Sequence, residues 1–305
     1  MSLPVSLPDL YPGFATHRIA TTGAQIHLRT GGTGPPLLLV HGYPQTHVCW
    51  HKVAPVLARQ FTLVIPDLRG YGDSSAPATD AGHRTYAKRA MALDLVEAMR
   101  ALGHARFLLA GHDRGGRVAY RLALDHPPAV IRLATLDIVP TYDAYLGWAP
   151  ADAVGKFHWP FLARPAPFPE QVIARDPTHW LDYLFACWAG TGDLSPFAPE
   201  ALQHYRHHFA KPTMIHATCE DYRAGATCDF ANDAADVEAG RQIACPLLAL
   251  WGQGRTAGGV GSAALDVWRR WAGDVRGFGL PCGHFLAEEA PDETARALIA
   301  FFGTG

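Results

Sequence analysis

Short apolar runs alternate along the chain with longer segments in which apolar residues recur at helical spacing. The runs predict strands at Ala15–Ala20, Gln25–Arg29, Pro36–Val40, Phe61–Pro66, Arg106–Ala110, within Val130–Val139, and at Pro246–Trp251 and Val275–Phe278. The helical spacing predicts helices at Tyr86–Leu102, Gly116–Leu124, Ser262–Trp271 and Glu293–Phe302. Strands that alternate with helices are typical of a mostly parallel sheet covered on both faces. The pattern therefore predicts an α/β fold.

The pattern changes between residues 140 and 228, where the chain is rich in Pro, Trp, His and Phe and has no clear strand-like run. Strand-like runs resume afterwards, so this stretch is predicted to be an insert between two parts of one sheet. We expect a core formed by residues 1–140 and 229–305, and an inserted helical cap formed by residues 141–228. An insert at the ends of strands is well placed to be a lid over an active site.

An aspartate stands where the segment from Leu108 to Arg117 has the spacing of a nucleophile elbow. An apolar strand runs into Gly111-His112-Asp113-Arg114-Gly115, and a helical pattern follows at once. A carboxylate at this position attacks a saturated carbon, displaces a leaving group and forms an ester. The alternative is that Asp113 is a helix N-cap that follows a strand.

A nucleophile of this kind needs a base for the second half of its reaction. His284 is the candidate, because it lies in a loop just after the last predicted strand and follows the nucleophile late in the chain. The acid that orients it is predicted to be Asp137, at the end of the strand after the elbow helix. The other usual place, the loop from Gly252 to Thr256, holds no carboxylate. Alternatively, Asp137 is a turn residue before Pro140.

Two arginines follow the nucleophile closely. Arg114 and Arg117 are spaced i, i+3 at the start of a helix and share a face. An anionic substrate about 4 Å from Asp113 would be repelled by on the order of 4 kcal/mol at an effective dielectric of 20. Two guanidinium groups offset this repulsion and bind a carboxylate in bidentate fashion. The pair therefore predicts an anionic substrate, the alternative being two surface arginines.

Two further groups of donors complete the expected site. His41-Gly42-Tyr43-Pro44 follows an early buried strand, where an oxyanion-hole loop is expected, so the backbone N–H groups of Tyr43 and Arg114 are the candidate pair. In the insert, His158, Trp159 and Tyr222 each offer a polar hydrogen from an apolar side chain, which suits a departing halide. Ordinary packing of the lid accounts equally well for these three side chains.

The overall composition excludes several other classes of function. The net charge of −2 and isoelectric point near 6.8 give no basic surface for nucleic acid or membrane. No run of 18 apolar residues predicts a membrane span, and residues 1–9 show no signal peptide. The six cysteines are scattered without a C-x-x-C pair, which favours free thiols in a reducing compartment over a disulfide framework or a zinc site. A cytoplasmic protein without a metal is therefore expected.

Taken together, these residues resemble the fluoroacetate dehalogenases of the α/β-hydrolase superfamily, over nearly the whole chain. The resemblance rests on His41–His47, Asp67–Ser75, Gly111–Arg117, Asp137, His158-Trp159 and Gly283-His284-Phe285. Arg114, directly after the nucleophile, distinguishes this resemblance from its neighbours, since haloalkane dehalogenases and epoxide hydrolases usually carry tryptophan at that position. Tyr43 departs from the phenylalanine common in the family, which matters little if only its N–H is used.

The resemblance implies an α/β-hydrolase core with an inserted helical cap, and it implies roles for the site residues. Asp113 would be the nucleophile, His284 the base and Asp137 its partner. The substrate carboxylate would be bound by Arg114 and Arg117, and the halide by His158, Trp159 and Tyr222, with Trp188 a lid contact. A cofactor-free homodimer that converts a small 2-haloacid, such as fluoroacetate, to glycolate and halide is expected. An epoxide hydrolase and a non-catalytic carboxylate-binding protein remain the alternatives.

Overall fold

The computed structural model describes residues 7–146, 148–254 and 261–303. Most of the segment considered for a signal peptide, residues 1–6, lies outside the described residues, as do Arg255 and Thr256 of the loop that lacks a carboxylate. Among the described residues, no helix combines the length and the apolar character needed to cross a membrane.

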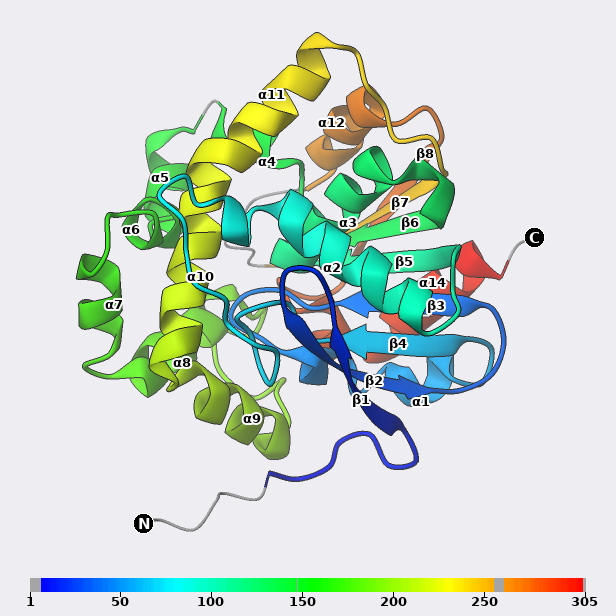
Figure 1. The fold of residues 1–305 in the computed structure, drawn as a ribbon, viewed down its shortest axis with the longest axis horizontal. Helices are drawn as coiled ribbons and strands as arrows, with labels where there is room; N and C mark the ends of the chain where they lie inside the picture. Colours follow the sequence, from blue (N-terminus) through cyan, green and yellow to red (C-terminus); the bar gives the residue numbers. More distant parts are fainter. Residues whose placement is uncertain (1–6, 147, 255–260, 304–305) are drawn as a thin grey trace.

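In the described part of the chain, eight strands form one sheet in the order β1-β2-β4-β3-β5-β6-β7-β8 (Figure 1). The strands are β1 Ala15–Ala20, β2 Gln25–Gly31, β3 Pro36–Val40, β4 Thr62–Pro66, β5 Phe107–His112, β6 Val130–Leu136, β7 Leu247–Gly252 and β8 Val275–Leu280. The pairs β1–β2 and β2–β4 are antiparallel, and the other neighbouring strands are parallel. The predicted mostly parallel sheet is confirmed.

Burial along the strands follows their places in the sheet. Every residue of the inner strands β5 and β7 is buried, as expected for strands covered on both faces. The edge strand β1 has no fully buried residue and presents alternate side chains to solvent. The continuous apolar runs in the sequence therefore mark the central strands of the sheet. Because these strands are parallel, their carboxyl ends lie along the same edge of the sheet.

Helices cover both faces of this sheet. Figure 1 shows α2 (Lys88–Ala101) and α3 (Asp113–Asp125) in front of the strands, and α14 (Pro291–Phe302) behind them. The helix α12 (Ala263–Trp271) packs with α3, since the Trp268 and Tyr120 rings lie 5.8 Å apart. The short α1 (Ala54–Leu57) contacts α14. The C-terminal loop after β8 leads through α13 (Leu286–Glu289) into α14.

Helices also fill the insert between β6 and β7. They are α4 Thr141–Tyr145, α5 Pro150–Gly155, α6 His158–Leu162, α7 Phe168–Ile173, α8 Pro177–Trp188, α9 Pro199–Phe209, α10 Pro212–Ala224 and α11 Phe230–Glu238. A π-helical turn, Gly225–Asp229, joins α10 to α11 without a break. The expected division between cap and core at residues 228 and 229 falls inside this turn, and the division itself stays a prediction.

The predicted bounds of the strand and the helix at the elbow are wrong. The helix predicted from Gly116 begins at Asp113, and the strand predicted to end at Ala110 continues to His112. Glycine has a low helix propensity, so Gly115 and Gly116 conceal the first turn of α3 in the sequence pattern. Packing against the neighbouring strands overrides this propensity, and the strand passes directly into the helix at the candidate nucleophile.

Candidate active site

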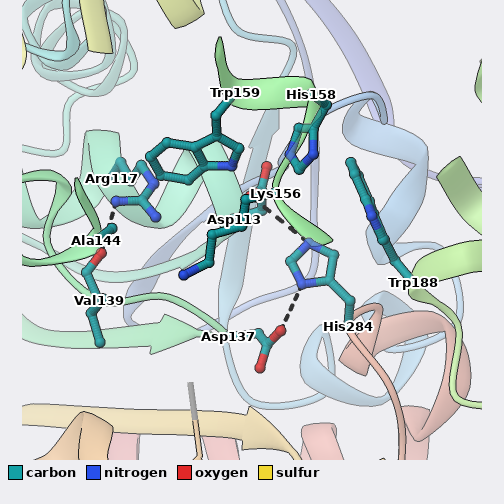
Figure 2. Close-up of a pocket in the computed structure, with 10 residues that line it drawn as sticks. All are labelled: Asp113, Arg117, Asp137, Val139, Ala144, Lys156, His158, Trp159, Trp188 and His284. Carbon is teal, nitrogen blue, oxygen red and sulfur yellow. Dashed lines mark hydrogen bonds and ion pairs between the residues drawn. The ribbon is translucent and has the colours of Figure 1, made fainter. Parts of the chain in front are cut away.

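Asp113 lies at the sharp turn between β5 and α3. Its φ of +47° is in the left-handed region, which aspartate tolerates better than most residues. A Cβ at Gly115 would lie 2.2 Å from the carbonyl oxygen of His41, so glycine is required for α3 to start this close to the end of β3. This is the geometry of a nucleophile elbow, and it directs the Asp113 carboxylate into a cavity (Figure 2).

The surroundings of Asp113 favour its ionised form. Burial raises the pKa of the Asp113 carboxyl, but the nearby charges, that of His284 first, lower the pKa by more, so the net shift is downward. The backbone N–H of Tyr43 donates a hydrogen bond of 2.8 Å to Oδ1 of Asp113. Asp113 is therefore a carboxylate near neutral pH and needs no base to remove a proton before it attacks.

His284 and Asp137 lie together beside this carboxylate. Nδ1 of His284 lies 2.6 Å from Oδ2 of Asp137, and Nε2 of His284 lies 3.8 Å from Oδ2 of Asp113 (Figure 2). Oδ1 of Asp137 accepts a hydrogen bond of 3.1 Å from the backbone N–H of Gly252. Because the carboxylate of Asp137 holds the proton on Nδ1, Nε2 of His284 is left to act as a base toward the cavity.

The electrostatics of His284 are consistent with such a base. Burial lowers the pKa of His284, but the hydrogen bond to Asp137 and its charge raise it by more, so the pKa lies above the ordinary value of 6.5. The 3.8 Å from Nε2 of His284 to Oδ2 of Asp113 is too long for a hydrogen bond. His284 is therefore placed to act on a water molecule next to the Asp113 carboxyl group rather than on that group itself.

A further acid, Glu289, holds the loop that carries His284. One oxygen of its carboxylate accepts the backbone N–H groups of Gly190, at 2.7 Å, and Gly283, at 2.9 Å. The other oxygen accepts the N–H of Phe285 at 2.9 Å. The residues on both sides of His284 are thus tied to one carboxylate, which also ties them to Gly190, just after α8 of the insert. The position of the imidazole therefore depends on Glu289.

The two arginines differ in their surroundings. Arg114 is fully buried and does not line the cavity; its Nη2 lies 2.6 Å from Oδ1 of Asp221, which also binds Lys88. Arg117 lines the cavity, and its Nη1 donates to the carbonyl oxygen of Val139 at 2.8 Å. Nη1 of Arg114 and Nε of Arg117 are buried and have no hydrogen-bond partner in the described part of the protein. Such donors are costly unless a bound group accepts them.

The insert supplies the opposite wall of the cavity. His158 and Trp159, at the start of α6, line it together with Trp188 at the end of α8 (Figure 2). Burial lowers the pKa of His158 to about 3, so this side chain is neutral, and its Nδ1 is buried without a partner among the described residues. Tyr222 does not line the cavity, but its ring lies 5.7 Å from that of His158 and 6.0 Å from that of Trp159.

The cavity is small, and the one cluster of potential metal ligands among the described residues does not line it. Its volume is about 50 Å³, room for only a few water-sized groups. Among the described residues, His27, His47 and Asp67 form one cluster of potential metal ligands, and none of the three lines this cavity. Nδ1 of His27 lies 3.1 Å from one oxygen of the Asp67 carboxylate, and Nδ1 of His47 lies 2.9 Å from the other. The hydrogen bonds between these three side chains therefore account for their burial without a metal ion.

Comparison with known proteins agrees with this geometry. A model of the alpha/beta hydrolase fold matches residues 35–286, and the chain belongs to this family. The expected α/β-hydrolase core is thereby confirmed.

The individual relatives narrow the similarity further. The chain is 44% identical over 295 residues to a protein named fluoroacetate dehalogenase from Burkholderia sp, covering 96% of this chain and 95% of that one. It is 32% identical to a soluble epoxide hydrolase from Corynebacterium sp. (strain C12), covering 94% and 96%. A solved structure of a putative alpha/beta hydrolase from Nostoc sp PCC 7120 has a TM-score of 0.92 at 49% identity, covering 96% and 99%. The predicted resemblance to the fluoroacetate dehalogenases is confirmed by the identity over nearly the full length of both chains.

Three residues of the site escaped the sequence analysis. Lys156 lines the cavity, Asp221 holds Arg114, and Glu289 holds the His284 loop. Lys156 and Asp221 stand beside the aromatic residues chosen as halide donors. The charge of Lys156 next to an apolar stretch was an available signal, whereas Asp221 lies in a charged run and is not marked in this way. Nothing in the sequence marks Glu289, because its partners are backbone N–H groups of a loop and of the distant Gly190.

Proposed function

We propose that this protein hydrolyses the carbon–halogen bond of a small 2-haloacid, with fluoroacetate as the first candidate, to give glycolate and halide. The observation that carries the proposal is the pairing of an ionised elbow carboxylate, Asp113, with the unpartnered guanidinium N–H groups of Arg114 and Arg117. N–H groups of this kind donate to a carboxylate, and they would offset the repulsion between Asp113 and an anionic substrate. The similarity to a protein named fluoroacetate dehalogenase supports the same assignment.

In the first step of the proposed reaction, an oxygen of Asp113 attacks the carbon that bears the halogen. A carbon–oxygen bond forms, the carbon–halogen bond breaks, and halide leaves toward the donors of His158, Trp159 and Tyr222. These donors replace part of the water shell of the halide. The product of this step is an ester between Asp113 and the substrate.

In the second step, Nε2 of His284 takes a proton from a water molecule, and the resulting hydroxide attacks the carboxyl carbon of the ester. Asp137 stabilises the imidazolium that forms. The backbone N–H of Tyr43, already bonded to Oδ1 of Asp113, is placed to bind the negative oxygen, and the N–H of Arg114 is proposed as its partner. The imidazolium of His284 returns its proton to the oxygen of the leaving glycolate, and the new carboxyl group of Asp113 loses the second proton of the water to solvent. Asp113 has then exchanged one oxygen with water.

Epoxide hydrolysis is the second candidate, because a soluble epoxide hydrolase is 32% identical over most of both chains. That reaction also uses an elbow aspartate but requires an acid for the epoxide oxygen. Tyr222 offers a hydroxyl near the cavity, and the hydroxyl of Tyr43 accepts a hydrogen bond of 2.8 Å from Nε1 of Trp180, which leaves its own O–H able to donate. An epoxide without a carboxylate would leave Nη1 of Arg114 and Nε of Arg117 without a hydrogen-bond partner, which favours the haloacid.

The test is to incubate the purified protein with fluoroacetate, chloroacetate and styrene oxide in separate reactions, following free halide and diol. Fluoride release supports the proposal in full. Chloride release without fluoride keeps the reaction class and identifies chloroacetate as the better substrate. Diol formation without halide favours the epoxide hydrolase. Tight binding of acetate with no turnover of any compound favours a carboxylate-binding protein.

We expect the Glu289→Gln variant to lower kcat roughly tenfold and to move the acid limb of the kcat–pH profile to lower pH. His284 must be neutral to act as a base, so activity is lost as the pH falls through its pKa. The negative charge of Glu289 raises that pKa, and its removal therefore lowers it. Glutamine also cannot accept all three backbone N–H groups, so the loop loosens. The measurement is kcat for chloroacetate as a function of pH.

The matched control for this variant is Glu238→Gln, which removes the same charge from an exposed position on α11. The control is expected to keep the acid limb of the unmodified protein. An unchanged acid limb in Glu289→Gln would contradict the role assigned to this carboxylate.

A further inference from the structure

Lys156, between α5 and α6, is a cation of the cavity to which the proposed reaction gives no role. Its side chain is only 15% exposed. The described residues give its ammonium no hydrogen bond; Nζ lies 3.9 Å from Oδ1 of Asp152 and 5.5 Å from the centre of the Trp148 ring. The ammonium of Lys156 is therefore mostly shielded from water and has only a long ion pair and a cation–π contact.

The direction of the side chain is informative. A surface lysine usually extends its ammonium into water while its methylene groups cover apolar surface. Figure 2 shows the Lys156 side chain entering the same cavity as Arg117 and Asp113 instead. Burial lowers the pKa of Lys156, the charge of Asp152 offsets part of this shift, and Arg117 nearby lowers the pKa further. An ammonium held in this way is stabilised by an anion that enters the cavity.

The charges around the cavity show which anion is favoured. Asp113 and Asp137 are the carboxylates that line it among the described residues, and Arg117 and Lys156 are the cations. The charge of Arg114 is already offset, since Asp221 binds it at 2.6 Å. A substrate carboxylate would be the third negative group in the cavity. Without Lys156, only Arg117 would balance these three carboxylates from within the lining.

We propose that the ammonium of Lys156 forms, with Arg117, an anion subsite that binds the carboxylate group of the substrate and of the product. This inference rests on the proposed function for the identity of the substrate, although binding of a carboxylate is testable without turnover. Because the subsite acts on a group that stays charged throughout the reaction, it contributes mainly to binding and little to the chemical step. It selects small carboxylic acids over uncharged halides of the same size.

The experiment measures acetate binding by calorimetry and steady-state kinetics with chloroacetate, for the unmodified protein and for Lys156→Met. We expect Lys156→Met to weaken acetate binding and raise KM roughly tenfold, about 1.4 kcal/mol, with less than a roughly threefold change in kcat. Both effects should shrink at high salt, because the lost interaction is electrostatic. Lys156→Arg keeps the charge and should recover part of the acetate affinity that Lys156→Met loses.

The matched control is Arg175→Met, which removes one positive charge from an exposed position of the insert. It should leave acetate binding and KM unchanged, which excludes an effect of net charge alone. Unchanged acetate affinity in Lys156→Met, or a loss confined to kcat, would overturn the subsite. Acetate binding that depends on Lys156 in a protein that releases no halide would uphold the subsite and refute the proposed function. Absence of acetate binding in the unmodified protein would refute the subsite.

Discussion

The Asp113→Ala variant is expected to release no halide from fluoroacetate or chloroacetate, a loss on the order of 10⁴-fold or more in kcat. In the proposed reaction, Asp113 makes the bond to the reacting carbon, and no neighbour is placed to replace it. Asp137, the other carboxylate of the lining, is held by His284 and by the N–H of Gly252. The measurement is free halide over many hours, with a melting curve to show that the variant is folded.

Two controls distinguish covalent catalysis from loss of charge. Asp266→Asn removes a carboxylate that is 79% exposed and should keep full activity. Multiple turnovers of the unmodified protein in ¹⁸O-labelled water should place the label in the side chain of Asp113, because the second step replaces one of its oxygens. Label in the product alone, with an unlabelled Asp113, would mean that water attacks the substrate directly and that no ester forms.

The His284→Asn variant is expected to release about one equivalent of halide per site and then stop. The first step needs only an ionised Asp113, whose pKa is lowered by its surroundings, and His284 does not hydrogen-bond to it. The second step needs a base for water, which this variant lacks. The ester should therefore accumulate, visible by mass spectrometry as a carboxymethyl group on the peptide that carries Asp113.

His179→Asn, at an exposed position of α8, is the control for loss of a histidine and should turn over continuously. In His284→Asn, Asp137 keeps the N–H of Gly252 but loses its buried partner, so a loss of stability of about 1–3 kcal/mol is expected. Continuous halide release by a folded His284→Asn variant would show that another group serves as the base.

Much of this arrangement followed from the order of residues along the chain. Asp113, Asp137 and His284 each come directly after, or within a few residues of, one of the parallel strands. Parallel strands bring such positions to one edge of the sheet, so their proximity was predictable before their distances were known. The strand that runs into Gly-x-Asp-x-Gly likewise predicted the elbow, although the glycines concealed where the helix begins.

The donors of the insert and the arginines were harder to predict. Sequence spacing placed Arg114 and Arg117 on one face of a helix but did not show that Asp221, 107 residues away, holds Arg114. The tertiary contact decides that Arg117 lines the cavity while Arg114 lies behind it. Tyr222 contacts His158 and Trp159 without lining the cavity, and this contact comes from the packing of α10 against α6.

By itself, the sequence determined the class of fold, the elbow and the chemical character of its nucleophile, because these depend on local spacing and on the type of side chain at one position. Only the tertiary structure decided which N–H groups lack partners, which carboxylate holds the His284 loop, and that Lys156 enters the cavity. These features depend on contacts between segments far apart in the chain and on the exclusion of water between them. Neither leaves a periodic signal in the sequence.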